Sequence, residues 1–174
     1  MNPEQVFLQT LASDGVCYID DDISPSTLRV VTKTLTYAHT RKMPLTLYIK
    51  SSGGDVLTSL KIYSALQAYS FPVTGIIIGE ANSASATILQ GCTIRLMHRY
   101  NSIHLHAVES KRSVYQKEDV EGMRMQHIVE GILTEKTNLS KEEINKIMIN
   151  PGGKRFFDKE ILDAGLADKF VEKN

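Results

Sequence analysis

The sequence predicts an α/β domain with a mostly parallel sheet. Apolar runs that suit buried strands alternate along the chain with segments whose apolar residues recur every three or four positions, as on one helix face. This alternation of strands and helices is typical of right-handed crossovers between parallel strands. In such sheets the reacting groups gather at the carboxyl ends of the strands, so residues distant in sequence can meet there.

The length of the chain fits a single domain. With 174 residues, it is long enough for one hydrophobic core and too short for two ordinary domains. We therefore expect one domain over residues 1–174. A short N-terminal lead, 1–14, contains an apolar segment that could pair locally or dock on a neighbour.

Composition excludes several classes of function. The chain has 20 basic and 20 acidic residues and a formal charge of zero, so no global field attracts nucleic acid or an anionic membrane. There is no signal-like N-terminus and no apolar run near the ~20 residues that span a bilayer. We expect a soluble cytoplasmic protein. Cys17 and Cys92 lie in apolar contexts without paired metal spacing, which indicates reduced core residues. No metal or organic cofactor is expected.

The first half of the chain contains the regular alternation. In order, we expect a strand at 15–19, a helix at 26–39, a strand at 44–50, a helix at 56–69 and a strand at 73–78. The acidic triplet at 20–22 precedes Ser24 and Pro25, and we interpret it as a solvated turn that caps the following helix. A metal site is less favoured, because consecutive carboxylates repel one another unless further ligands hold an ion.

The second half of the chain is more irregular. A long amphipathic helix is expected at about 118–136, and Ser140 with Glu143 forms a capping box that starts a short helix ending near Asn150. The remainder predicts a helix at about 158–164 and a last strand near 166–171.

A serine-bearing turn is the centre of the expected chemistry. Residues 79–86, GEANSASA, follow the strand at 73–78 and lead into a helix around 87–90. A serine on such a turn projects out of the sheet, and backbone N–H groups at the helix start can receive negative charge that develops on a substrate. Ser83 is the preferred nucleophile, and Ser85 is its rival.

Two further motifs frame this turn. The strand at 44–50 ends in residues 51–55, SSGGD, where paired glycines permit backbone geometry or ligand approach that side chains would block. Residues 103–106, IHLH, alternate and place both histidines on one face of a short strand. The three motifs together favour acyl transfer, in which an imidazole removes the proton of a serine nucleophile.

These motifs resemble those of ClpP, the proteolytic subunit of the Clp protease. That family has a strand followed by Ser-Pro-Gly-Gly, a Gly-x-Ala-x-Ser nucleophile turn and a histidine on a later strand. The corresponding residues here are 51–54, with Ser52 in place of the proline, then 79–83, and then His106. The similarity extends from about 15 to 171 and includes a family-like ending at 160–168.

The resemblance implies a ClpP/crotonase-like fold with repeated β-α-β units and a protruding handle helix. It implies that Ser83 is the nucleophile and that His106, rather than His104, is the general base. The backbone N–H groups of Gly54 and Ala84 would then form the oxyanion hole.

The resemblance also implies partners. The family forms two stacked heptameric rings, a tetradecamer, in which the helix at 118–136 would interlock the rings; a helix that covers its own subunit's core explains the apolar stripe equally well. Substrates would be unfolded or short polypeptides, supplied by an AAA+ unfoldase. The lead at 1–14 is short for the family's axial loop, which contacts that ATPase.

The third member of the triad departs from the family pattern. ClpP usually has an aspartate just ahead of an aromatic or apolar pair that precedes its last helix. The corresponding segment, 151–157, contains no aspartate, and Asp158 lies on the far side of the phenylalanine pair. Asn150 is the nearest polar residue and could accept a hydrogen bond from His106 through its amide oxygen. Asp158 and a backbone carbonyl are the alternatives. Because an amide adds no negative charge, we expect slow but real peptidase activity.

Three classes of function remain open. The leading hypothesis is a ClpP-like serine endopeptidase. The alternative is a catalytically weak or inactive ClpP-like subunit that acts in assembly or as an adaptor, which the missing aspartate and short N-terminus favour. A third is a crotonase-type acyl-CoA enzyme, against which the serine on the turn argues.

Overall fold

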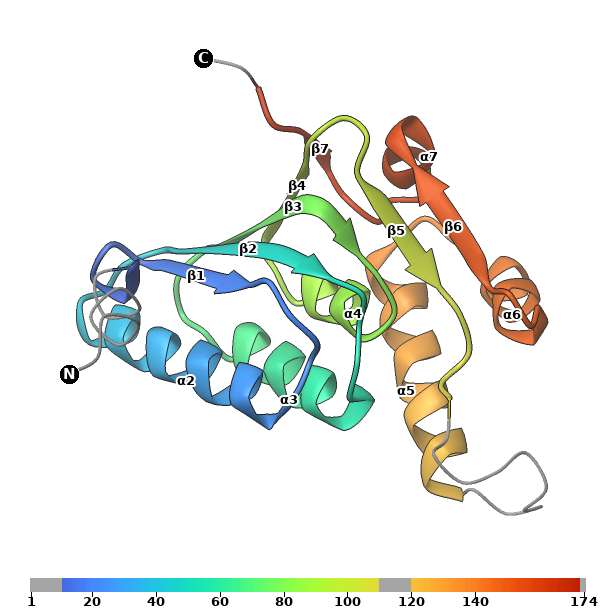
Figure 1. Ribbon diagram of the computed structural model, residues 1–174, viewed down its shortest axis with the longest axis horizontal. Helices are drawn as coiled ribbons and strands as arrows, with labels where there is room; N and C mark the ends of the chain where they lie inside the picture. Colours follow the sequence, from blue (N-terminus) through green and yellow to red (C-terminus); the bar gives the residue numbers. More distant parts are fainter. Residues whose placement is uncertain (1–10, 110–119, 173–174) are drawn as a thin grey trace.

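The computed structural model describes residues 11–109 and 120–172 (Figure 1). The first ten residues of the expected N-terminal lead therefore lie outside the described part, as do the first two residues of the helix expected at 118–136. Within the two described ranges, no helix is long and apolar enough to cross a bilayer.

A parallel sheet is the centre of the fold, as the sequence predicts. Its main path runs in the order β1, β2, β3, β4, β7, and each neighbouring pair is parallel. The strands are β1 Val16–Ile19, β2 Leu45–Ser51, β3 Val73–Ala81, β4 Ile94–Met97 and β7 Lys169–Phe170. Strand β4 is not among the strands expected from the sequence, and β7 is shorter than the strand expected at 166–171.

A second group of strands branches from the carboxyl end of β3. Strand β5 (Ser102–Leu105) pairs in parallel with β3 and antiparallel with β6 (Lys154–Phe157). Strand β6 is not predicted, because its sequence KRFF does not alternate between polar and apolar residues. Its register with β5 brings the preceding turn, at 150–153, to the end of β5.

Three helices accompany the main sheet. Helices α2 (Pro25–Thr40) and α3 (Val56–Gln67) lie side by side below the strands in Figure 1, and α4 (Ala84–Gln90) follows β3. The side chain of Asp55 caps α3 by accepting a hydrogen bond from the Thr58 N–H at 2.7 Å. Every residue of α4 is buried.

The remaining helices lie towards the C-terminus: α5 (Val120–Lys136), α6 (Lys141–Ile149) and α7 (Asp158–Asp163). The predicted capping box of α6 is present, with Ser140 and Glu143 each binding the other's backbone N–H. Figure 1 shows α5 extending away from the sheet. Its first half exposes Val120 and Met123, whereas its second half buries Leu133, as a protruding handle helix does.

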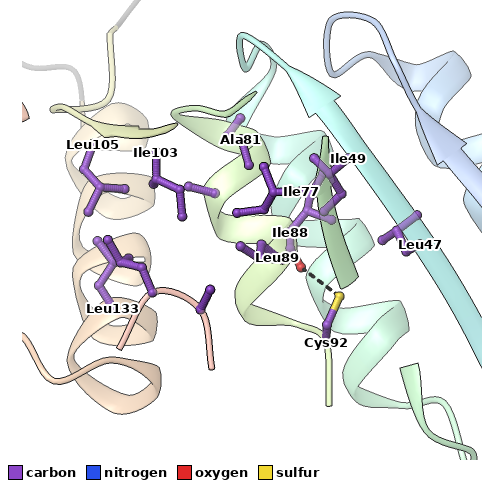
Figure 2. Close-up of a cluster of buried hydrophobic side chains, with 14 of the residues drawn as sticks. Leu47, Ile49, Ile77, Ala81, Ile88, Leu89, Cys92, Ile103, Leu105 and Leu133 are labelled. Carbon is purple, nitrogen blue, oxygen red and sulfur yellow. Dashed lines mark hydrogen bonds between the residues drawn. The ribbon is translucent and has the colours of Figure 1, made fainter. Parts of the chain in front are cut away.

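The hydrophobic core joins the sheet to α4 and to the second half of α5. In Figure 2, Ile77 of β3 lies beside Ile88 of α4, while Ile103 and Leu105 of β5 face Leu133 of α5. All five side chains are buried. The strand ends that carry the predicted site residues therefore rest on one packed cluster.

Arg95 anchors the C-terminal end of α5 to the sheet. From β4 its guanidinium donates to the carbonyl oxygens of Lys136 at 2.9 Å and Gly165 at 2.8 Å, and it forms an ion pair with Asp168. The Lys136 carbonyl belongs to the last turn of α5, whose carbonyl groups lack partners within the helix. The arginine thus fixes one end of this helix.

Both cysteines of the chain are buried free thiols, as expected. Burial raises the pKa of Cys17 to about 11 and that of Cys92 to about 12. The sulfur of Cys92 faces the Ile88 carbonyl oxygen (Figure 2), and a Cβ atom added at Gly75 would lie 2.7 Å from that sulfur. The thiol therefore fills a tight position in the core.

Candidate active site

The serine turn connects the end of β3 to the start of α4. Ser83 immediately precedes α4 and has φ 51° and ψ −122°, a backbone conformation that residues with a side chain rarely adopt. Its N–H donates to the His104 carbonyl oxygen at 2.7 Å, and its own carbonyl oxygen accepts from the Ala86 N–H at 3.0 Å. These bonds hold the turn against β5 and leave the half-buried hydroxyl at the surface of a pocket.

Ser85, the rival nucleophile, faces the protein interior. Its side chain is fully buried, and its hydroxyl lies 2.7 Å from the Asn82 carbonyl oxygen and 3.1 Å from that of Ser51. Because the hydroxyl proton is used in these contacts, Ser85 ties the turn to the end of β2. It does not line the pocket that contains Ser83.

The two histidines at the end of β5 have different surroundings. Their rings lie on the same side, with centroids 5.3 Å apart. The Nε2 atom of His104 lies 2.8 Å from the Gly152 carbonyl oxygen, whereas Nδ1 of His106 lies 2.7 Å from the Ala107 carbonyl oxygen. A carbonyl oxygen can only accept, so Nδ1 of His106 is the donor in this contact. In the neutral imidazole Nε2 then has the free lone pair.

Ser83 and His106 line the same pocket. Thr87 is its other polar residue, and the rest of the lining is apolar and comes from four helices, the end of β5 and the loop after it: Val56, Ala84, Leu105, Val108, Val129, Leu133 and Met148. Among the contacts of the described residues, no direct hydrogen bond joins Ser83 to His106. In catalytic sites this bond is often long before substrate binds.

The paired glycines approach the serine turn closely. A Cβ atom added at Gly53 would lie 2.8 Å from the Cβ atom of Ser83, and one added at Gly54 would lie 2.5 Å from the Ile23 carbonyl oxygen. Both glycines have positive φ, of 116° and 137°. A side chain at Gly53 would therefore push the loop away from the serine, and one at Gly54 would push it away from Ile23.

The predicted oxyanion donors have free N–H groups. The bonds of this loop run from the Ile23 N–H to the Gly53 carbonyl oxygen and from the Asp55 N–H to the Ile23 carbonyl oxygen, which leaves the Gly54 N–H unused. The Ala84 N–H likewise has no acceptor among the described residues. Ala84 lines the pocket with Ser83, and Gly54 follows Gly53, which packs against Ser83. Backbone donors without an acceptor are the kind of group that can bind a developing oxyanion.

The structure does not bring the Asn150 side chain to His106. Its amide nitrogen donates to the Gly153 carbonyl oxygen at 2.7 Å, and its amide oxygen accepts from the Gly152 N–H at 3.2 Å. The turn that this amide closes does pack on the histidine, because a Cβ atom added at Gly153 would lie 2.7 Å from Cβ of His106. Asn150 thus contacts His106 only through the turn.

The two acidic candidates for the third position differ in location. Asp158 accepts a hydrogen bond from the Tyr100 N–H at 2.7 Å and follows Phe157, which pairs with Ser102 at the opposite end of β5 from His106. Glu109 was not among the expected site residues. Its Oε1 atom lies 3.7 Å from Nδ1 of His106, although its side chain is 86% exposed. The sequence signal for Glu109 is its spacing, since it follows His106 by three residues.

Asn150 and Asp158 are expected to respond differently to alanine substitution. Asn150→Ala removes both amide bonds of the turn that packs on His106, so we expect kcat for a short peptide to fall about tenfold. Asp158→Ala is expected to change kcat less than twofold, because its bond lies at the far end of β5. Hydrolysis is compared in variants that retain the oligomeric state of the unmodified protein. A complete loss in Asp158→Ala with an unaffected Asn150→Ala would show that Asp158 is the acid.

Comparisons with known proteins bear on the family and the fold of the chain. A profile of the Clp protease family matches residues 4–174. The chain is 31% identical over 155 residues to ATP-dependent Clp protease proteolytic subunit 1 of Thermobifida fusca (strain YX), covering 84% of this chain and 68% of the relative. The structure superposes on an asparagine-to-aspartate mutant of ClpP1 from Listeria monocytogenes with a TM-score of 0.83 and 22% identity, covering 96% of each chain.

The fold and the comparisons together define a class of protein: an α/β serine peptidase of the ClpP type. The chain belongs to the Clp protease family.

Proposed function

We propose that this chain is a serine endopeptidase subunit that hydrolyses peptide bonds of unfolded polypeptides. The observation that carries the proposal is the shared pocket, which Ser83, Ala84 and His106 line together. Gly54 follows Gly53, which packs against Ser83, and the N–H groups of Gly54 and Ala84 have no acceptor among the described residues. A nucleophile, a base and two oxyanion donors are the groups that acyl transfer requires.

In the proposed reaction, Nε2 of His106 takes the hydroxyl proton of Ser83 as the serine oxygen bonds to the peptide carbonyl carbon. The carbonyl oxygen becomes an oxyanion, which the N–H groups of Gly54 and Ala84 stabilise; removal of one such donor costs about 2.7–4 kcal/mol in other enzymes. The imidazolium then gives its proton to the leaving amine as the C–N bond breaks. Water, activated by the same imidazole, hydrolyses the acyl-enzyme that remains.

The orientation of His106 rests on a neutral group in this proposal. The Ala107 carbonyl oxygen fixes the tautomer, and the loop that carries it is held by the Val108 N–H, which donates to Gln126 of α5 at 2.6 Å. A carbonyl stabilises an imidazolium less than a carboxylate does. The Glu109 carboxylate is exposed and therefore strongly screened by water and salt. Turnover is accordingly slow, and Asn150 contributes by shaping the neighbouring turn.

We also propose that the chain works as a homo-oligomer of two stacked heptameric rings, supplied with substrate by an AAA+ unfoldase. The family resemblance implies this assembly. Support comes from the apolar side chains of Val120, Met123 and Ile128, which α5 exposes on the subunit surface. The printed name of the Thermobifida fusca relative, an ATP-dependent protease subunit, is consistent with an ATPase partner.

The alternative is a catalytically weak or inactive subunit of the same family that acts in assembly. The observation that favours it is the turn at Gly152 and Gly153, which holds no acid beside His106 where the family pattern has an aspartate nearby. This alternative shares the fold and differs in whether Ser83 is nucleophilic.

A fluorophosphonate probe distinguishes the two hypotheses. We expect the probe to label the assembled protein, and mass spectrometry to place the adduct on Ser83, because Ser83 lines the pocket with His106 and Ser85 does not. The probe is applied to fractions whose mass is measured by light scattering, where a particle of about fourteen subunits is expected from the family resemblance. Ser83→Ala should lose the adduct and Ser85→Ala should retain it. An adduct on Ser85 would reject Ser83 as the nucleophile, and an unlabelled assembled particle would reject the endopeptidase. A stable monomer would reject the assembly.

A further inference from the structure

A hydrogen-bonded cluster surrounds the side chain of Asn82, the residue before the serine. The Nη1 atom of Arg155 lies 3.3 Å from Oδ1 of Asn82 and 3.1 Å from the hydroxyl of Ser102. The same Nη1 atom is 3.7 Å from a Glu80 carboxylate oxygen, which accepts from the amide nitrogen of Asn82 at 2.5 Å. Both ends of the Asn82 amide are therefore held by groups of opposite charge.

The backbone of Asn82 is fixed as firmly as its side chain. Its N–H donates to the Ser51 carbonyl oxygen at 3.0 Å, and its carbonyl oxygen accepts from the N–H and the hydroxyl of Ser85. Asn82 is 4% exposed, whereas the Arg155 and Glu80 side chains are about 40% exposed. The cluster thus connects the partly exposed side chains of Arg155 and Glu80 to the buried amide of Asn82.

This restraint lies next to the strained residue of the turn. A serine at φ 51° and ψ −122° persists only where its surroundings impose that conformation. The peptide between Asn82 and Ser83 is held at its carbonyl oxygen by Ser85 and at its N–H by the His104 carbonyl oxygen. The cluster adds a restraint on the side chain of Asn82, on the other side of that residue. The position of the serine hydroxyl therefore depends on contacts made one residue before it.

Strand β6 connects this cluster to the other half of the site. Gly153, just before β6, packs against His106, and Arg155, two residues later, reaches Asn82. Lys154 between them pairs with Leu105 of β5. One short strand therefore contacts both the residue that precedes the serine and the histidine, although its sequence has no motif that would indicate this.

We propose that Arg155 is a positioning residue, which with Glu80 clamps Asn82 and keeps Ser83 in its reactive conformation. The proposal rests on the proposed function of Ser83 as nucleophile. Arg155 does not touch the pocket, so it acts on the rate of serine acylation and not on substrate binding.

The test measures fluorophosphonate labelling of Ser83 over time in the assembled protein, together with kcat and KM for a short peptide and the melting temperature. Arg155→Met keeps the length and apolar stem of the side chain and removes its donors. We expect labelling and kcat to fall about tenfold with KM changed less than twofold, since small misplacements of reacting groups have effects of this size. Arg155→Lys, which retains one charged donor, should recover part of the loss. Arg29→Met, an exposed position on α2, is the matched control and should behave as the unmodified protein.

Two results would overturn the clamp. If Arg155→Met lowers the melting temperature but labels at the unmodified rate, the arginine is merely structural. If Arg155→Met raises KM with kcat unchanged, it acts on substrate binding. If the unmodified protein does not label at Ser83, the proposed function itself is rejected. If the unmodified protein and Arg155→Met label at the same rate, only the clamp is rejected. Glu80→Gln provides a second variant, and a loss as large as that of Arg155→Met supports the shared clamp.

Discussion

His106→Ala is expected to lower kcat/KM for a short peptide by roughly 10²- to 10⁴-fold, the range that general-base catalysis contributes. The reason is the tautomer: Nδ1 donates to the Ala107 carbonyl oxygen, so Nε2 is the nitrogen that can accept a proton in the pocket that contains Ser83. Hydrolysis of a fluorogenic peptide, measured on fractions of confirmed size, checks this value.

His104→Ala is the matched control for that experiment. His104 lies on the same strand face with its ring 5.3 Å from that of His106, but its Nε2 atom is bound to the Gly152 carbonyl oxygen outside the pocket. Its loss should reduce kcat/KM only a few fold through the neighbouring turn. Equal losses in the two variants, or a larger one in His104→Ala, would exclude His106 as the base.

Gly153→Asp is expected to destabilise the protein and not to increase its activity, although it adds an acid beside His106. Gly153 has φ 61°, and an added Cβ atom would overlap the Leu105 carbonyl oxygen and lie 2.7 Å from Cβ of His106. Left-handed geometry alone costs about 1–2 kcal/mol, and the backbone must also move. A total of ~3 kcal/mol would lower the melting temperature by roughly 6–12 °C for a domain of this size.

Gly152→Ala separates this effect from a general sensitivity of the turn. A Cβ atom at Gly152 would have Asn150 Oδ1 at 3.9 Å as its nearest neighbour, which is an ordinary contact. Thermal unfolding followed by circular dichroism should show little change for Gly152→Ala and a large fall for Gly153→Asp. A Gly153→Asp protein with an unchanged melting temperature and higher kcat would show that the turn accepts an acid after all.

Local sequence patterns were sufficient to predict most of the fold and the serine turn. The capping box at Ser140 and the strand that begins at Val73 depend on residues close together in the chain, and their side-chain chemistry or apolar pattern is visible in sequence. The strand itself continues to Ala81, three residues beyond the predicted end at 78. The same holds for the glycines at 53 and 54, whose positive φ explains why no other residue stands there.

The rest of the site depends on contacts that have no local pattern. Strand β6 forms because β5 offers it an edge, and Arg155 reaches Asn82 across 73 positions of sequence. The bonding of the Asn150 amide depends on how the turn at 150–153 bends, which a sequence containing two glycines leaves undetermined. The role assigned to Asn150 from sequence therefore stays a prediction.

The burial of both thiols limits their competition with Ser83 for covalent reagents. Many electrophiles that acylate serine peptidases also react with cysteine, but the thiolate is the reactive form. With pKa values of about 11 and 12, Cys17 and Cys92 hold on the order of 10⁻⁴ or less of their population as thiolate at pH 7. The sequence contains no other cysteine. We therefore expect broadly reactive lactones or carbamates to react slowly with the two thiols of the folded protein.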